Sequence, residues 1–221
     1  MLLEYIMIIM YFYVRIFMVI LMSDIYLIRH GFTPANNANY NQQRGLWKIA
    51  EDKDMPLEME YGEEQARELG RFLNTMEGNA FIMVSPYRRT LQTLSLALRE
   101  MHGDYQVRVC DELHENNSGI HYAKTKDEIL EMYPESKETF TDFENNPLET
   151  AYLGGESEYD VRDRVMNISE EILRIQKEKE YDFIFIFAHG NVNRWLYYWI
   201  NQEMPNFKQK NCEVIIGSGS M

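Results

Sequence analysis

The sequence predicts an α/β fold, a three-layer sandwich in which helices cover both faces of a mostly parallel central sheet. The first observation behind this is that short apolar runs of strand length recur along the chain, with helix-like segments between them. The second is that residues 183–188 are apolar on both faces, as a central strand covered on each side requires. Strands that alternate with helices are typical of a largely parallel sheet.

Each expected element has a local reason. Strands are expected where β-branched and aromatic residues concentrate, at 25–28, 80–84, 106–109, 183–188 and, more weakly, 213–216. Helices are expected where apolar residues recur at helical spacing, at 62–76, 90–101, 157–180 and 192–200. Ser157 is a suitable N-cap, because Asp160 follows three residues later. The polar, Asn-rich stretches 36–59 and 118–155 predict loops and short helices that form a lid over a site.

Composition limits the class of protein. The chain has 221 residues, of which 45% are hydrophobic, so one domain with a substantial core is expected and wholesale disorder is excluded. The formal net charge of −13 argues against a nucleic-acid partner and against a polybasic membrane-surface protein. With only Cys110 and Cys212, neither a disulfide scaffold nor a Cys-rich zinc site is expected, and a cytoplasmic location fits.

The first 22 residues differ from the rest, because they are apolar apart from Glu4 and Arg15. A secretory signal peptide is disfavoured, since the start lacks basic residues and no small-residue cleavage site follows. Two interpretations stay open. In the first, residues 1–22 are a membrane anchor, and Arg15 would raise the free energy of insertion by about 2.5–3.5 kcal/mol if it lay at the centre of the span. In the second, they are a dispensable extension, and translation truly starts at Met22. Residues 23–221 are expected to form one domain.

Reactive side chains follow the expected strands at their carboxyl ends. In an open parallel sheet, these ends share one edge, and ligands bind beyond it. The sequence therefore predicts a single site that combines histidines, arginines and a carboxylate. Its candidates are Arg29 and His30 after the first strand, Arg88 and Arg89 after the second, a carboxylate within 111–115 and His189.

These residue types suit phosphoryl transfer. A neutral imidazole is a good nucleophile toward phosphorus, and arginine forks match the geometry of phosphate oxygens. A carboxylic acid can protonate the leaving oxygen and afterwards activate water. Glycine follows both His30 and His189, where it would let the backbone approach an anion closely.

Several segments carry a family resemblance, and they occur in family order. They are residues 27–33 with Asn36, 85–93, 113–115 with Gly119, 155–157 with Arg164, and 187–191. Together they resemble the histidine phosphatase superfamily, the phosphoglycerate mutase-like proteins, over nearly all of residues 24–216. The resemblance implies a phosphoglycerate mutase-like fold and a histidine phosphatase domain over residues 23–221.

The resemblance also implies roles. His30 would attack phosphorus and become phosphohistidine, without a metal or cofactor. Arg29, Arg89 and His189 would hold the phosphoryl oxygens, with His189 helping most when protonated. Glu115 would act as acid and then base, although Glu112 is close enough in sequence to be confused with it. The expected substrate-binding residues are Gly31, Thr33, Asn36, Gly190 and Asn191.

Supporting residues are harder to assign. Glu156 is expected to support the site rather than take part in the chemistry. Asn36 and Asn191 each have a local alternative, as a turn cap and as a helix start. His102, His114 and His121 show no metal-ligand spacing and are expected at the surface or behind the site residues.

Among activities, hydrolysis of a small organic phosphate ester is favoured. Residues 116–122 do not resemble the segment that follows the acid in glycolytic mutases, but Asn191 is mutase-like and keeps a cofactor-dependent phosphoglycerate mutase as an alternative. A non-catalytic phospho-ligand binder or membrane-tethered scaffold is a second alternative, disfavoured because His30, Glu115 and His189 are all present. A membrane partner is expected only if residues 1–22 are an anchor, and homodimer formation stays open.

Overall fold

The computed structural model describes residues 24–37, 45, 53–206 and 208–217. The elements, in order, are β1 (Asp24–Arg29), η1 (Pro34–Asn36), α3 (Tyr61–Leu73), β2 (Ala80–Val84), α4 (Arg88–Leu98), β3 (Tyr105–Val109), η2 (Asp111–Leu113), η3 (Gly119–His121), α5 (Lys126–Met132), α6 (Ser136–Asn145), α7 (Glu158–Glu178), β4 (Phe183–Ala188), α8 (Gly190–Asn201) and β5 (Val214–Gly217). Residues 1–22 lie outside the described ranges. Within those ranges, no helix is both long and apolar enough to cross a membrane.

The sheet has the strand order β3-β2-β4-β1-β5. The first four strands are parallel, and β5 runs antiparallel to β1. Arg29 is in register with Ala188, and Val84 with Phe187, so β1, β2 and β4 end at nearly the same level. The expected strands and the mostly parallel sheet are confirmed, and the common edge on which the predicted site depends is present.

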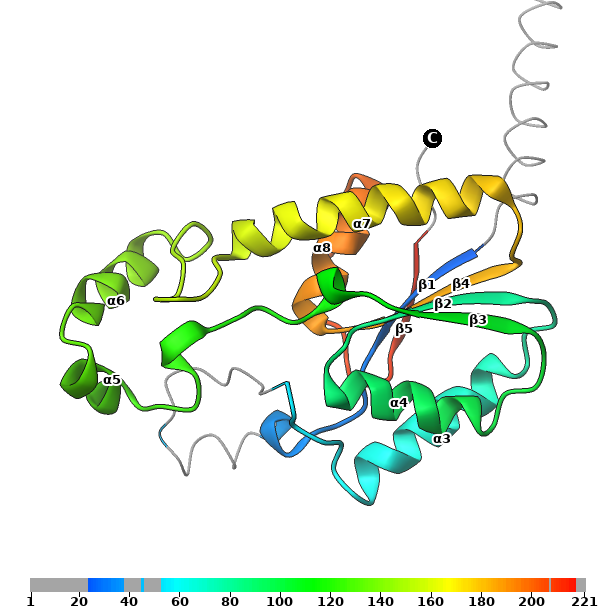
Figure 1. Cartoon of the computed structure of the whole chain (residues 1–221), viewed down its shortest axis with the longest axis horizontal. Helices are drawn as coiled ribbons and strands as arrows, with labels where there is room; N and C mark the ends of the chain where they lie inside the picture. Colours follow the sequence, from blue (N-terminus) through cyan, green and yellow to red (C-terminus); the bar gives the residue numbers. More distant parts are fainter. Residues whose placement is uncertain (1–23, 38–44, 46–52, 207, 218–221) are drawn as a thin grey trace, which may run out of the picture.

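Helices cover both faces of this sheet, as expected (Figure 1). Alternate residues of a strand point to opposite faces, so Ile25 and Leu27 join the core under α7 and α8, whereas Tyr26 and Ile28 join the core under α3 and α4. Alternate side chains of β4 also belong to the two cores, so the strand is buried on both faces. This burial explains why residues 183–188 are all apolar. The three-layer sandwich is therefore correct.

A helical segment made of η3, α5 and α6 extends away from the sheet (Figure 1). Thr125 and Glu128 form a capping box that starts α5. His121 is fully buried inside this segment, where its Nε2 lies 3.4 Å from Ser136 Oγ and its ring packs against Phe140. The expectation that His121 lies at the surface or behind the site was wrong, because its ring fills the small core of the helical segment. Most of the other expected lid stretch, 38–44 and 46–52, lies outside the described residues.

Candidate active site

The sheet places the two predicted histidines beside each other. Beyond the strand ends, His30 donates its backbone N–H to Ala188 O at 3.1 Å, and Ser85 donates to Phe187 O at 2.9 Å. These bonds continue the parallel pairing by one residue and fix where each side chain emerges. The rings of His30 and His189 consequently have their centres 5.3 Å apart, and both residues are almost completely buried.

Local hydrogen bonding sets the tautomer of His30. Its Nδ1 lies 2.8 Å from the backbone oxygen of Gly31. A carbonyl oxygen can only accept, so Nδ1 carries the proton and Nε2 carries the lone pair in the neutral ring. Nε2 is therefore the nitrogen equipped to act as a nucleophile.

His189 has the same tautomer for a different reason. Arg89 Nη2 lies 3.0 Å from His189 Nδ1, and a guanidinium can only donate, so Nδ1 accepts. Nε2–H then donates to Ser85 Oγ at 2.8 Å. Burial, followed by the charges of Arg89 and His30, holds the pKa of His189 well below its usual range. A lowered pKa favours the neutral form of His189, because this ring is desolvated beside cations.

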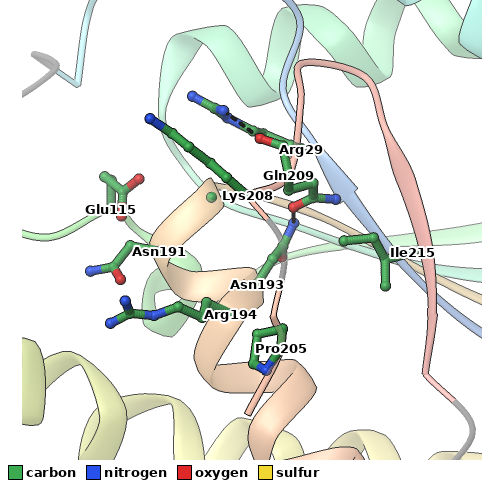
Figure 2. Close-up of a pocket in the computed structure, with 10 residues that line it drawn as sticks. Arg29, Glu115, Asn191, Asn193, Arg194, Pro205, Lys208, Gln209 and Ile215 are labelled. Carbon is green, nitrogen blue, oxygen red and sulfur yellow. Dashed lines mark hydrogen bonds between the residues drawn. The ribbon is translucent and has the colours of Figure 1, made fainter.

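Arg29 lies over the start of α8. Its Nη1 donates to Gln209 O at 2.7 Å, and a Cβ built on Gly190 would lie 3.5 Å from Arg29 Nε. His189 is the N-cap of α8 and makes no side-chain cap bond, so the helix N-terminus faces the two histidines and Arg29. Such a terminus favours an anion, since its first N–H groups lack helical partners. Asn191 belongs to this first turn and lines the adjoining cleft (Figure 2).

The two candidate acids, Glu115 and Glu112, lie in different surroundings. Glu115 lines the same cleft as Arg29 and Gly190, whereas Glu112 is exposed outside it. Glu115 Oε1 accepts the backbone N–H of Asn116 at 3.0 Å, which holds the carboxylate against its own loop. This placement favours Glu115 as the acid.

Glu156 clamps the loop that carries Glu115. Its carboxylate accepts from Arg164 Nε at 2.8 Å and Nη2 at 3.1 Å, and from the backbone N–H of Asn117 at 3.0 Å. Arg164 in turn donates to the carbonyl of Glu112. Hydrogen bonds therefore hold the loop on both sides of Glu115.

The turn after His30 has a mainly structural arrangement. Asn36 Oδ1 accepts from the backbone N–H of Thr33 at 3.0 Å, from Thr33 Oγ1 at 3.1 Å and from Asn211 Nδ2 at 2.9 Å. Gly31 donates its N–H to Thr93 Oγ1 at 2.9 Å, and a Cβ there would lie 2.8 Å from the carbonyl of Gly62. The expectation that Gly31 lets the backbone approach an anion is corrected, since its close approach is to another backbone segment and its N–H is already bound.

Comparison with known proteins agrees with this geometry. A model of the histidine phosphatase superfamily (branch 1) matches residues 25–218. The chain belongs to the histidine phosphatase superfamily. The predicted enzyme class is thereby confirmed. None of the curated proteins searched matches the chain.

Solved structures show the same fold as this histidine phosphatase. The α-ribazole phosphatase from Shigella flexneri has a TM-score of 0.67 at 23% identity, covering 88% of this chain and 89% of its own. A mycobacterial glucosyl-3-phosphoglycerate phosphatase has a TM-score of 0.63 at 22% identity, covering 88% and 92%. Phosphoglycerate mutase from Bacillus anthracis has a TM-score of 0.63 at 19% identity, covering 90% and 89%. The phosphoglycerate mutase-like fold is confirmed.

Tyr87 is a site residue that the sequence analysis missed. Its ring centre lies 5.2 Å from that of His189 and 6.1 Å from that of His114, and Arg89 Cζ lies 4.9 Å from it. Burial raises the pKa of Tyr87, which keeps its hydroxyl protonated near neutral pH. Its position between Ser85 and Arg89 could have indicated a place in the site. However, an aromatic residue at the start of a helix usually serves in packing, and its side chain does not by itself indicate a catalytic role.

The histidine phosphatase site opens into a cleft of about 410 Å³. Figure 2 shows side chains from the start of α8, the loop before β5 and the Glu115 loop arranged around it. Its lining residues are Arg29, Glu115, Gly190, Asn191, Asn193, Arg194, Pro205, Lys208, Gln209 and Ile215. Arg194 and Lys208 were not singled out from the sequence, because neither follows a strand directly.

Proposed function

We propose that this histidine phosphatase hydrolyses small phosphomonoesters through a phosphohistidine at His30. The observation that carries the proposal is the pair of buried rings 5.3 Å apart, one with its Nδ1 held by the Gly31 carbonyl and the other bonded to Arg89. One neutral nucleophile beside fixed cationic donors is what an in-line attack on a phosphate ester requires. The substrate would be a small-molecule ester, with no nucleic acid involved.

In the first step, His30 Nε2 forms a bond to phosphorus while the bond from phosphorus to the leaving oxygen breaks. Glu115, protonated, gives its proton to that oxygen. Arg29, Arg89 and the helix α8 N-terminus hold the phosphoryl oxygens and offset their charge. His189, held by Arg89 and Ser85, is positioned beside the same group.

In the second step, water attacks the phosphohistidine. Glu115, now a carboxylate, accepts a proton from the water as the new oxygen–phosphorus bond forms. The bond between His30 Nε2 and phosphorus breaks, its electron pair returns to nitrogen, and inorganic phosphate leaves. Gly31, Thr33 and Asn36 support this cycle by holding His30 and its turn rather than by contacting phosphate, as their hydrogen bonds indicate.

Mutase activity is a second candidate, supported by Asn191 at the first turn of α8, where it lines the cleft. In that reaction a phosphorylated His30 would transfer its phosphoryl group to an organic hydroxyl instead of to water. Interconversion of 2- and 3-phosphoglycerate after priming with a bisphosphate would favour the mutase over the phosphatase.

The test is phosphate release from p-nitrophenyl phosphate by the full chain with EDTA present. We expect steady turnover by the wild type and a loss of about 10³-fold or more in His30→Ala, since this change removes the nucleophile. The matched control is His102→Ala, an exposed histidine outside the site, which should keep wild-type turnover. Turnover that survives in a folded His30→Ala variant would overturn the proposal.

A further inference from the structure

The cleft beside the histidine pair has an unusual charge for this chain. Among the residues lining it, Arg29, Arg194 and Lys208 are cationic and only Glu115 is acidic. The chain as a whole carries a formal net charge of −13. The lining of this cleft is therefore net cationic, although the protein as a whole is acidic.

The fold holds the Arg194 side chain in place, whereas it leaves the Lys208 side chain without a salt bridge to any described residue. Arg194 Nη2 pairs with Glu158 Oε2 at 2.8 Å, and its Cζ lies 4.9 Å from the ring centre of Trp195, so the guanidinium is kept in one place. Lys208 is exposed and forms no salt bridge with any residue of the described ranges. Glu158 offsets the charge of Arg194, which leaves the ammonium of Lys208 without a neighbouring counter-charge.

A buried amide network fixes the backbone next to Lys208. Gln209 Nε2 donates to Leu27 O at 2.9 Å and to Glu213 O at 2.8 Å, so its Oε1 must face Asn193. Asn193 Nδ2 donates to that oxygen at 2.9 Å. This orientation leaves Asn193 Oδ1 buried without a hydrogen-bond partner in the described part of the chain. The loop carrying Lys208 is thus anchored to both β1 and α8 at the wall of the cleft.

We infer that this cleft receives the leaving group of the substrate, and that Lys208 binds a second anionic group on it. The inference rests on the proposed function, because Glu115 marks where the leaving oxygen must lie, and Lys208 lines the same cleft as Glu115 (Figure 2). A volume of about 410 Å³ suits a leaving group of metabolite size. The shared chemistry is a carboxylate or a second phosphate, either of which an ammonium can bind.

The test uses competition, so it does not depend on which compound is turned over. With p-nitrophenyl phosphate as reporter, competitive inhibition constants are measured for glycerol 3-phosphate, 3-phosphoglycerate and glycerol 1,3-bisphosphate. The second compound adds a carboxylate and the third adds a phosphate to nearly the same skeleton. We expect one of the doubly anionic compounds to bind about five- to tenfold more tightly than glycerol 3-phosphate. The stronger of the two identifies the anion.

The variant Lys208→Ala should remove most of that preference, so that the constants for the doubly anionic compound and for glycerol 3-phosphate become nearly equal. Lys208→Glu should reverse the preference, since it places a like charge at the same point. The matched control is Lys210→Ala, an exposed lysine two residues along the same loop that does not line the cleft. It should behave as the wild type.

Equal constants for all three compounds in the wild type, or equal effects of Lys208→Ala and Lys210→Ala, would overturn the inference. Failure of the proposed function looks different, because the wild type would then release no phosphate from the reporter, or His30→Ala would still do so. The two failures are therefore distinguishable in one set of assays.

Discussion

His30 and His189 are the same residue type at the ends of adjacent strands, yet their partners prepare them for different tasks. The Nδ1–H of His30 is bound by a neutral carbonyl, which leaves Nε2 nucleophilic. The Nδ1 of His189 accepts from Arg89, which ties the ring to a buried cation. Sequence position alone makes the two equivalent, and only these hydrogen bonds distinguish the nucleophile from its neighbour.

Tyr87 gives a prediction at the residue scale, as a positioning residue. Its ring packs against His189 and lies over the guanidinium of Arg89. We expect Tyr87→Ala to lower kcat for p-nitrophenyl phosphate about tenfold, because it removes a cation–π contact and a packing surface that hold both groups.

Rescue by the conservative variant separates positioning from chemistry. Tyr87→Phe keeps the ring and should stay within about twofold of the wild-type kcat, since the contacts are made by the ring face. If kcat falls as much in Tyr87→Phe as in Tyr87→Ala, the hydroxyl takes part in the reaction. An unchanged kcat in Tyr87→Ala would contradict the positioning role.

At the scale of elements, α7 links the sheet to the acid. It begins at a capping box in which Ser157 Oγ accepts the N–H of Asp160 at 3.0 Å, and it runs along the sheet beside α8. Arg164, two turns into this helix, reaches Glu156 and the carbonyl of Glu112. A helix that serves as a core layer thereby also determines where the Glu115 loop lies.

The corresponding prediction concerns Glu156→Gln. This change removes the charge that pairs with Arg164 and weakens the bond to Asn117 N, so the Glu115 carboxyl should move away from the leaving oxygen. Proton donation matters most for a poor leaving group. We expect kcat to fall about tenfold for glycerol 3-phosphate and by less than about threefold for p-nitrophenyl phosphate.

The control for this prediction is Ser157→Ala, which weakens the start of α7 by about 1 kcal/mol without touching the clamp. Thermal unfolding should detect that loss, while the ratio of the two kcat values stays at the wild-type level. If Glu156→Gln lowers kcat by the same factor for both substrates, Glu156 acts through general stability and not through Glu115.

At the scale of the whole molecule, buried histidines make folding sensitive to acid. Burial is the main cause that lowers the pKa of both His189 and His121 below the ordinary value of 6.5. Because the folded pKa values lie below the unfolded ones, the unfolded chain takes up protons first as the pH falls. Stability should therefore be constant above about pH 6.5 and decrease below it.

We expect the free energy of unfolding, from urea titrations, to fall by about 1 kcal/mol between pH 7.5 and pH 5.5 through these groups. His121→Gln should reduce that fall, because it removes one buried titrating ring from the helical segment of η3, α5 and α6. His102→Gln, at an exposed position, should leave it unchanged. An identical pH dependence in the wild type and His121→Gln would contradict the contribution of His121.

Much of this protein was predictable from local patterns. Alternation and apolar runs report burial, so the strands and the main helices could be placed, and the residues just beyond the strands could be grouped at one edge. His30 and His189 were grouped in this way, Arg89 was singled out by the family resemblance, and the structure brings the three together. The choice of Glu115 over Glu112 also agrees with its place in the cleft.

Three features depended on the tertiary structure. The tautomers and the lowered pKa of His189 come from partners about 100 residues away, such as Arg89 and Ser85. The buried position of His121 comes from the packing of short helices. The cations Arg194 and Lys208 belong to different segments, α8 and the loop before β5, and both line one cleft only in the folded chain.

The sequence by itself determined the fold class, the order of the strands along the chain and the chemical character of the site. These depend on periodicity and residue type, which are local properties. Only the tertiary structure decided which partner each reactive group has, how far its charge is desolvated and which surfaces enclose the leaving group. Those properties arise from contacts between segments distant in sequence, and such contacts are set by strand register and side-chain packing.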